Sequence, residues 1–138
     1  MMDLFSSVSW LSVVAAFVPY FMLGGLWFTV FFKKPYSISL GKENNMPEKP
    51  APIFIVGPAL CTLVITIASA LLMSALPIDS YGSAMALAVL VGIGYLVANT
   101  MNIAINPNIP KPIMYGIISS AYHMIGILIV FVILFAFK

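Results

Sequence analysis

The sequence contains no arginine, a single cysteine and few charged residues of either sign. Charged residues make up 7% of its 138 residues and hydrophobic ones 62%, which is far from the composition of a soluble domain. Cys61 has no second cysteine to pair with, which excludes an internal disulfide, a CxxC motif and cysteine-ligated zinc. The composition therefore indicates a membrane protein, and Cys61 is expected to be a core residue.

Charges are also absent from the long apolar runs, which divide the chain into four segments. About 20 apolar residues in a helix cross a bilayer core of about 30 Å, and the short alternating segments of a membrane β-barrel are missing. The first run is too long for a secretory signal and follows an acidic start, so we expect a retained span. The sequence predicts one all-α domain over residues 1–138. Its predicted transmembrane helices cover residues 8–32, 53–76, 83–106 and 113–137.

The positions of the lysines predict how these helices are oriented. Four lysines lie in loop 33–52 and one, Lys111, in the loop before helix 4, whereas Lys138 is the one lysine on the other side. The positive-inside rule places both basic loops in the cytoplasm and both termini outside. The two later connections are short, so helices 2, 3 and 4 should be antiparallel neighbours. Aromatic residues near the span ends, expected to be interfacial anchors, are Trp10, Tyr36 and Tyr81; Trp27 fits an anchor by its position but is also a candidate site residue.

Helix 3 carries polar residues at helical spacing, which is unusual for a membrane span. They continue a stripe of small residues that begins at Ala84 and Ala88 and allows close helix packing. Helix 4 has a matching stripe of glycines and serines around His123. Antiparallel pairing then predicts that Asn102 faces Gly116, Asn99 faces Ser119, and Tyr95 faces His123. The full stripe on helix 3 is Gly92, Tyr95, Asn99, Asn102 and Asn106.

This predicted seam between helices 3 and 4 has two interpretations. Asparagine, serine and histidine side chains often hold membrane helices together, at about 0.6 to 2 kcal/mol for each hydrogen bond. Alternatively they line a pocket, because an ionisable group at mid-membrane is a candidate functional residue, and His123 is the one such group near the centre. The candidate ligand or ion pocket consists of Tyr95, Asn99, Asn102, Asn106, Ser119, Tyr122, His123 and Trp27.

Several activities lack the residues that they need. Four-helix proton-coupled antiporters use an intramembrane carboxylate, and this sequence has none within its apolar runs. The glutathione-dependent membrane enzymes use buried Arg and Glu, and this sequence has no Arg. One histidine excludes bis-histidine haem ligation within one chain. Ser119 and Ser120 lie close to His123, but no oxyanion motif or orienting acid accompanies them. We therefore predict no enzyme, no catalytic residue, no metal and no cofactor.

Both ends of the chain are similar to one known family. The opening VSWLSVVAAFVPYFMLGGLWFTVFFKKPY and the late segment SSAYHMIGILIV resemble a family of small four-helix bacterial membrane proteins catalogued as a domain of unknown function. The resemblance implies the four-helix architecture and a bacterial inner-membrane location, and it implies no activity. The positions it singles out are Trp27, Asn99, Asn102, Tyr122 and His123.

The sequence leaves three functions open. The first is a non-enzymatic, self-associating helical bundle with a polar pocket between helices 3 and 4 that opens toward the cytoplasm. The second is an oligomeric transporter or channel lined by the asparagines and His123. The third is an accessory subunit of a larger membrane complex. The predicted partners are the lipid bilayer, a second copy in a homo-oligomer such as a dimer, and an unidentified membrane protein, with no nucleic acid.

Overall fold

Four helices of the structure are long and apolar enough to cross a membrane, which confirms the predicted all-α membrane fold. The computed structural model describes residues 2–44 and 49–138. The four spans are Trp10–Phe31, Ile53–Ala75, Tyr81–Ala104 and Pro112–Ala136. In chain order the elements, with π-helical segments written η, are α1 (Met2–Ser7), α2 (Trp10–Leu26), η1 (Trp27–Phe31), α3 (Lys33–Ser39), α4 (Ile53–Ala75), α5 (Tyr81–Val91), η2 (Gly92–Val97), α6 (Ala98–Ala104) and α7 (Pro112–Ala136).

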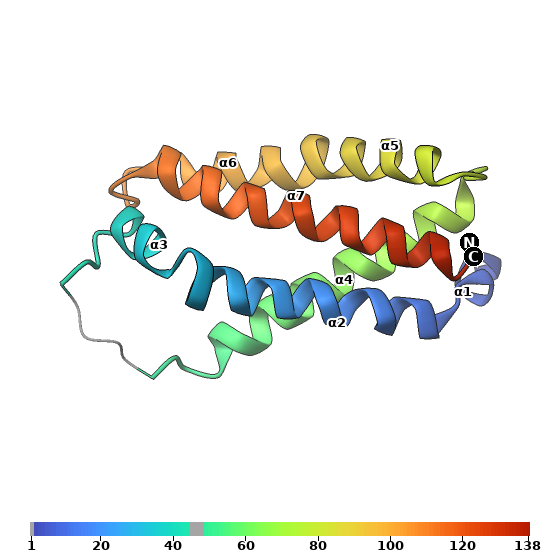
Figure 1. The fold of residues 1–138 in the computed structure, drawn as a ribbon, viewed down its shortest axis with the longest axis horizontal. Helices are drawn as coiled ribbons and strands as arrows, with labels where there is room; N and C mark the ends of the chain where they lie inside the picture. The colour runs from blue at the N-terminus through green and yellow to red at the C-terminus, as the bar shows by residue number, and fades with distance from the viewer. Residues whose placement is uncertain (1, 45–48) are drawn as a thin grey trace.

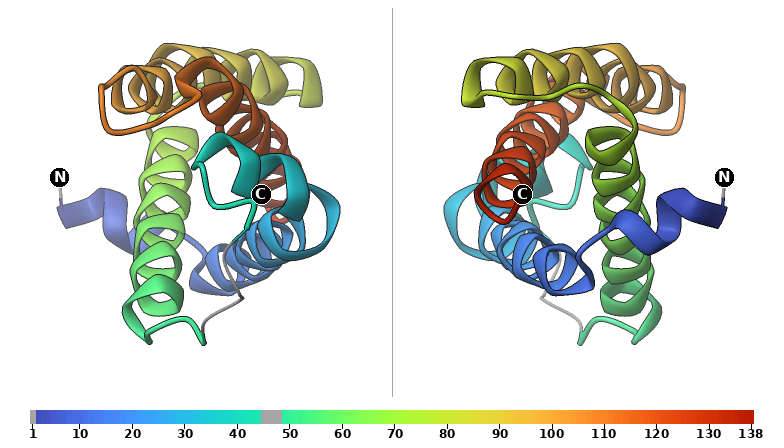
Figure 2. Two further views of the ribbon diagram at one scale, coloured as in Figure 1. Left: turned by 90° about the vertical axis from the view of Figure 1, so that its left-hand side faces the viewer. Right: turned by 90° about the vertical axis from the view of Figure 1, so that its right-hand side faces the viewer.

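The helices pack around α7, which is the most buried of the four spans (Figure 1). Within its most apolar window 50% of the residues are buried, against 17% to 22% for the other spans. α2 lies along one side of α7, α5 and α6 lie along another, and α4 crosses behind α2 and α7 (Figures 1 and 2). The largest fully buried side chains are Tyr20 on α2 and Phe131 and Ile127 on α7. The core therefore lies between α2 and α7.

Helices 2, 3 and 4 run antiparallel in turn, as predicted, and the two chain ends lie at the same end of the bundle (Figure 1). The expectation that all three are neighbours is wrong for one pair. α4 packs on α2 and α7 and has little contact with α5, η2 or α6. Because α4 and α6 each pack on α7 and not on one another, side chains from both can line a cleft between them.

The third span contains a π-helical segment that changes which side chains face α7. In η2 the Ala98 N–H donates to the Ile93 carbonyl, an i→i+5 bond, so the segment holds one residue more than an α-helical turn. One residue corresponds to about 100° of rotation. The packed face consequently moves by one position across η2. Its buried residues are Ala84, Ala88, Gly92 and Ala104.

The first part of the predicted cytoplasmic loop 33–52 is a helix. α3 follows Phe32, whose backbone leaves the helical conformation, and packs against α7. Ser39 is fully buried, and its carbonyl accepts a hydrogen bond of 3.2 Å from the Lys111 N–H. The prediction of a loop is therefore wrong for Lys33–Ser39. Residues 45–48 of the same loop lie outside the described residues.

Candidate functional site

His123 lies near the middle of α7 and is held by a phenol from α2. The Nδ1 of His123 lies 2.7 Å from the Oη of Tyr20. Tyr20 is fully buried, and among the described residues this is its one hydrogen bond. The Nε2, on the other side of the ring, has no partner in the described part of the chain, yet it is not a fully buried atom. His123 therefore presents an unpaired ring nitrogen to accessible space.

α2 and α7 hold this pair through a reciprocal tyrosine–glycine contact. A tyrosine precedes a glycine by four positions on each helix, as Tyr20 and Gly24 on α2 and as Tyr122 and Gly126 on α7. A Cβ added at Gly126 would overlap the Tyr20 ring, and one added at Gly24 would lie 2.9 Å from the Tyr122 Oη. The two rings pack with their centroids 5.4 Å apart. These contacts fix the depth of α2 on α7 and so place Tyr20 beside His123.

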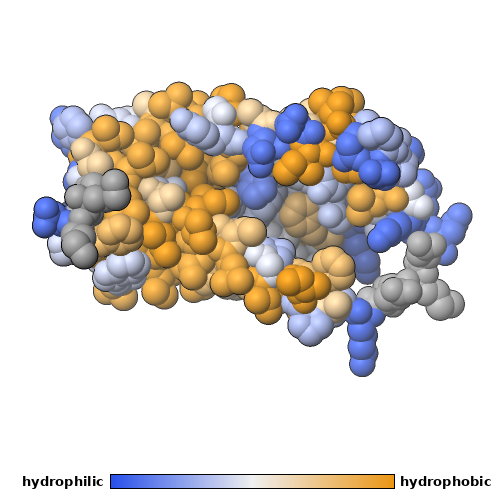
Figure 3. Space-filling view, turned by 180° about the vertical axis from the view of Figure 1, so that it is seen from behind, coloured by the Kyte–Doolittle hydropathy of each residue, from blue (hydrophilic) through white to orange (hydrophobic). Residues whose placement is uncertain are grey.

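A cavity of about 560 Å³ lies between α4 and α6 and extends to His123. Its size falls within the range of small-molecule sites. Seen from behind, the surface is hollowed between these helices (Figure 3). Some hydrophilic side chains lie in and beside the hollow, whereas apolar side chains cover most of the half of the bundle nearer the termini. We call this cavity the apolar chamber. It is lined by Leu60, Cys61, Val64, Ile65, Leu96, Asn99, Thr100, Ile103 and His123.

A second cavity of about 250 Å³ adjoins the apolar chamber and shares Thr100, Ile103 and His123 with it. Hydroxyl groups dominate its lining, so we call it the hydroxyl chamber. The hydroxyls of Thr100, Ser119 and Tyr122 make no hydrogen bond within the described residues, and none of them is a fully buried atom. They are therefore available to a bound molecule. The remaining lining residues are Phe28, Tyr36 and Tyr115.

Tyr36 lines the hydroxyl chamber from α3, outside the spans. Its ring packs against Phe28 and Tyr115, with centroids 4.7 Å and 5.7 Å away. Burial, and then the neighbouring Tyr115 hydroxyl, raise the pKa of Tyr36 to about 12. Tyr36 therefore stays neutral at physiological pH, and the hydroxyl chamber gains no charge from it.

The prediction placed residues of helix 3 at nearly the right depth along helix 4, but it chose the wrong face of helix 3. Gly116 lies against Met101 and Ala104 and not against Asn102. Asn102 is exposed, and Tyr95 is 69% exposed on the outer side of the helix. The cause is the extra residue of η2, which turns the asparagine stripe away from α7. Asn99 still reaches the same cavity as His123, through the apolar chamber.

The structure brings four of the predicted site residues to the two chambers, namely Asn99, Ser119, Tyr122 and His123. Tyr95, Asn102, Asn106 and Trp27 line neither chamber. Asn106 instead organises the turn after α6, because its Nδ2 donates to the Ile103 carbonyl at 2.6 Å and its Oδ1 accepts from the Asn108 N–H at 2.8 Å.

Trp27 is a packing residue at the junction of α2 and η1. It is buried, and its Nε1–H donates to the Ile118 carbonyl at 3.0 Å. Its ring stacks on Phe32 with the centroids 4.4 Å apart. Trp27 is therefore not an interfacial anchor, although its position near a span end fits one, whereas Trp10 and Tyr81 are both about half exposed, as that role requires.

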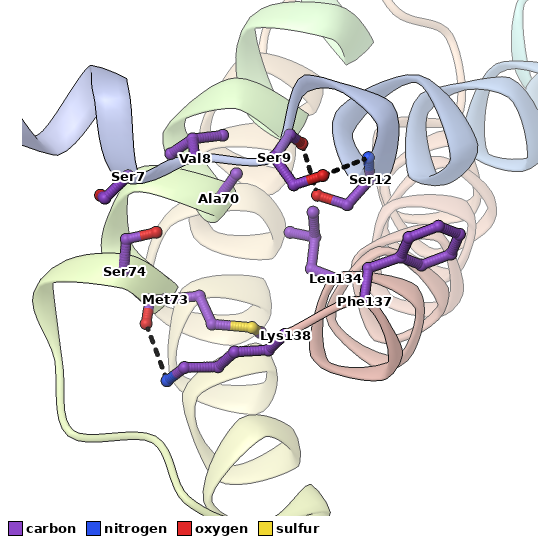
Figure 4. A pocket seen from close by; sticks show the side chains of 10 residues that line it. All are labelled: Ser7, Val8, Ser9, Ser12, Ala70, Met73, Ser74, Leu134, Phe137 and Lys138. Atoms are coloured by element: carbon purple, nitrogen blue, oxygen red, sulfur yellow. Dashed lines mark hydrogen bonds between the residues drawn. The ribbon is translucent and has the colours of Figure 1, made fainter.

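Another cavity, of about 260 Å³, lies at the end of the bundle where the termini meet (Figure 4). The Oγ of Ser12 donates to the Ser9 carbonyl at 2.6 Å, and the Oγ of Ser9 accepts from the Ser12 N–H at 3.4 Å. The Nζ of Lys138 donates to the carbonyls of Ile78 at 2.6 Å and Met73 at 3.5 Å. A cation beside the last carbonyls of a helix is stabilising. The serine bonds cap the start of α2, and the Lys138 bonds tie the chain end to α4 and the turn after it, so the cavity belongs to the scaffold.

Three residues of the site were missed or misjudged from the sequence: Tyr20, which holds His123, and the lining residues Thr100 and Cys61. The repeated tyrosine–glycine spacing on helices 1 and 4 is a sequence signal for Tyr20. Thr100 lies one position after Asn99 and faces the chambers because of η2. Cys61, expected in the core, is exposed in the apolar chamber. No pattern in the sequence signals the last two.

A family model described as "Protein of unknown function (DUF1761)" matches residues 11–135, which is most of the chain. The chain belongs to the DUF1761 family. This confirms the resemblance to a domain of unknown function drawn from the first and last spans. No curated protein and no solved structure matches the chain. Membership in DUF1761 therefore supplies no activity, and the architecture comes from the structure.

Proposed function

We propose that this DUF1761 protein binds a lipophilic molecule inside the membrane, in the cleft formed by the apolar and hydroxyl chambers. The observation that carries the proposal is the unpaired Nε2 of His123 at the junction of the two chambers. A ring nitrogen in that position has no protein partner, and an intramembrane ionisable side chain is a candidate functional residue. The sequence predicted a polar intramembrane pocket between helices 3 and 4. The proposal keeps that pocket and adds helix 2, which is α4, to its lining.

The shape of the cleft supports a ligand that is largely apolar. α4 contributes Leu60, Val64 and Ile65 to the apolar chamber, and these side chains match a hydrocarbon body. Because α4 and α6 have little contact with each other, a molecule dissolved in the bilayer has a lateral path between them. Asn99 and Thr100 lie beside that path and supply polar groups for orientation.

Binding without chemical conversion is the simplest use of this site. Within the described residues, neither Ser119 nor Ser120 hydrogen-bonds His123, and the Nδ1 of His123 is bound to a phenol. A nucleophilic serine needs a base in hydrogen-bond contact, oriented by a third group. The proposed protein is therefore a non-enzymatic binding bundle.

Filling the apolar chamber is expected to remove the bound molecule. Cys61→Trp places a large ring in the chamber, and Ala68→Trp makes a comparable change at another exposed position of α4 that does not line either chamber. We expect neutral lipids that co-purify in native-lipid discs, measured by mass spectrometry, to be enriched over the bulk membrane for wild type and Ala68→Trp. Cys61→Trp should lose the enrichment. The same lipid profile in all three proteins would contradict the proposed function.

We propose that the host membrane is a bacterial inner membrane, with both termini outside the cytoplasm. Five of the six lysines lie at the end of the bundle opposite the termini, which supports this orientation by the positive-inside rule. A reporter that is active in the cytoplasm alone should be silent when fused after Lys138, and one that is active outside should work there. The reverse pattern would invert the orientation.

A homo-oligomer, most simply a dimer, stays part of the proposal with narrower support. Of the small residues first assigned to an oligomer interface, Gly24 packs against Tyr122, and Ala84, Ala88 and Gly92 are buried in the chain itself. Gly25 has open space beside it. Exposed Asn102 and Tyr95 favour a covering neighbour, which can be a second copy or, for the accessory-subunit alternative, another membrane protein. The particle mass in nanodiscs distinguishes a monomer from multiples of 14.9 kDa.

A further inference from the structure

The hydrogen bond between Tyr20 and His123 determines which ring nitrogen carries the proton. Tyr20 is fully buried, and the Nδ1 of His123 is its one hydrogen-bond partner among the described residues. If Nδ1 carried the proton and donated it to Tyr20, the phenolic O–H would be left without an acceptor. A buried donor without a partner is destabilising. The Tyr20 O–H therefore donates to Nδ1.

A neutral histidine that accepts at Nδ1 carries its proton on Nε2. The proton therefore lies on the ring nitrogen that is unpaired and accessible at the junction of the two chambers. This nitrogen can donate a hydrogen bond and cannot accept one. The hydroxyls of Thr100, Ser119 and Tyr122 beside it are also without acceptors in the described structure. Each of these hydroxyls can donate or accept, whereas the Nε2–H can only donate, so the His123 ring is the group that selects an acceptor.

The lining of both chambers contains no formal charge, because neither includes an Asp, Glu, Lys or Arg. A cationic head group would meet the Nε2–H dipole with no carboxylate to compensate it. An anionic head group would find donors but no cation. Burying a charge without an opposite one is expensive. The lining thus favours a neutral molecule whose polar end accepts hydrogen bonds.

We propose that the ligand is a neutral lipophile with a carbonyl head group, a long-chain ketone or quinone in chemical class. Its carbonyl oxygen accepts from His123 Nε2–H at the junction, and its hydrocarbon lies between α4 and α6. This inference rests on the proposed function and assigns its ligand class. Tyr20 is a positioning residue, because it acts on the ligand through the tautomer of His123.

The test uses Cys61 as a reporter, since it lines the apolar chamber and is the one cysteine of the chain. Purified protein is alkylated with a membrane-permeant maleimide in the presence of 2-dodecanone, dodecylamine or dodecane, which share a similar chain and differ in the head. One neutral hydrogen bond contributes about 0.5–1.5 kcal/mol, or roughly two- to twelvefold in affinity. We expect 2-dodecanone to protect Cys61 at about two- to twelvefold lower concentration than dodecane, and dodecylamine to gain nothing over dodecane.

Two substitutions then locate the preference. His123→Phe keeps a ring and removes the donor, so 2-dodecanone and dodecane should protect equally. Tyr20→Phe leaves His123 in place but frees its tautomer, so the preference for the ketone should fall while dodecane protection is unchanged. A full ketone preference in Tyr20→Phe would overturn the positioning role. The three probes compared on the wild-type protein remain informative even if a variant fails to fold.

The outcomes separate this inference from the proposed function. If none of the three probes protects Cys61, the cleft does not take lipophiles and the proposed function fails. If dodecane or dodecylamine protects as well as the ketone, the cleft binds lipophiles and the carbonyl assignment is wrong. If 2-dodecanone protects Cys61 best, and this preference disappears in His123→Phe, the result supports both the proposed function and the carbonyl assignment.

Discussion

Gly126→Val is expected to be the most destabilising single substitution on α7. An added Cβ at Gly126 overlaps the Tyr20 ring, and valine adds two methyl groups beyond it. Overpacking of this kind costs about 1–3 kcal/mol when neighbours can move, and Tyr20 is fully buried. Moving the ring also breaks its bond to His123. We expect a fall in the free energy of unfolding of at least about 2 kcal/mol, measured by thermal or denaturant unfolding in a fixed detergent.

The matched control is Gly25→Val on α2. Gly25 is also inside a helix, but nothing lies within 4 Å of an added Cβ there. Its stability should stay within about 0.5 kcal/mol of wild type. The double variant Gly126→Val with Tyr20→Ala should lose less stability than the two single variants lose in sum, since removing the Tyr20 ring removes the clash. Equal losses at Gly25 and Gly126, or strict additivity, would show that the tyrosine–glycine contact is not the cause.

Deleting Gly94 is expected to leave the fold intact, although deletions inside membrane helices are ordinarily severe. η2 holds one residue more than an α-helix needs, so its loss converts the segment to α-helix and keeps both flanking faces on α7. Deleting Ala86 removes a residue from α5, which has no surplus. That deletion rotates the two sides of α5 relative to each other by about 100°. Either Ala84 on one side, or Ala88 and Gly92 on the other, then turns away from α7. We expect ΔAla86 to lose more than about 3 kcal/mol and ΔGly94 less than half as much.

Alkylation of engineered cysteines reports the facing directly, in a Cys61→Ala background. Asn102→Cys should react and Ala104→Cys should be protected, because Asn102 is exposed and Ala104 is fully buried. The same pattern should persist in ΔGly94. Gly94→Ala keeps the chain length and, with open space at that Cβ, should resemble wild type. If ΔGly94 exchanges the reactivities at positions 102 and 104, the third span is a continuous α-helix and the assignment of η2 is wrong.

His123 and Asn99 show what sequence reasoning could reach at the candidate site. Both were singled out as polar residues in an apolar span, and both line the apolar chamber. The predicted facing of Tyr95 with His123 and of Asn102 with Gly116 was wrong, because continuing the spacing of Ala84, Ala88 and Gly92 in an unbroken α-helix leads to Tyr95, Asn99 and Asn102. Tyr20 was within reach of the sequence, since its spacing to Gly24 repeats that of Tyr122 to Gly126. Thr100 and Cys61 were not.

The sequence by itself determined that the chain forms four apolar helices, roughly where each begins and ends, and that consecutive helices are antiparallel. Those properties depend on local hydrophobicity and on short connections. The tertiary structure alone decided which faces meet. α5 and α6 both pack on α7, and the chain between them has one residue more than a regular α-helix would need, so η2 forms there. Its i→i+5 bond, from the Ala98 N–H to the Ile93 carbonyl, has no signature in the local composition. The cleft likewise depends on the crossing of α4, which is set by packing on α2 and α7 far along the chain.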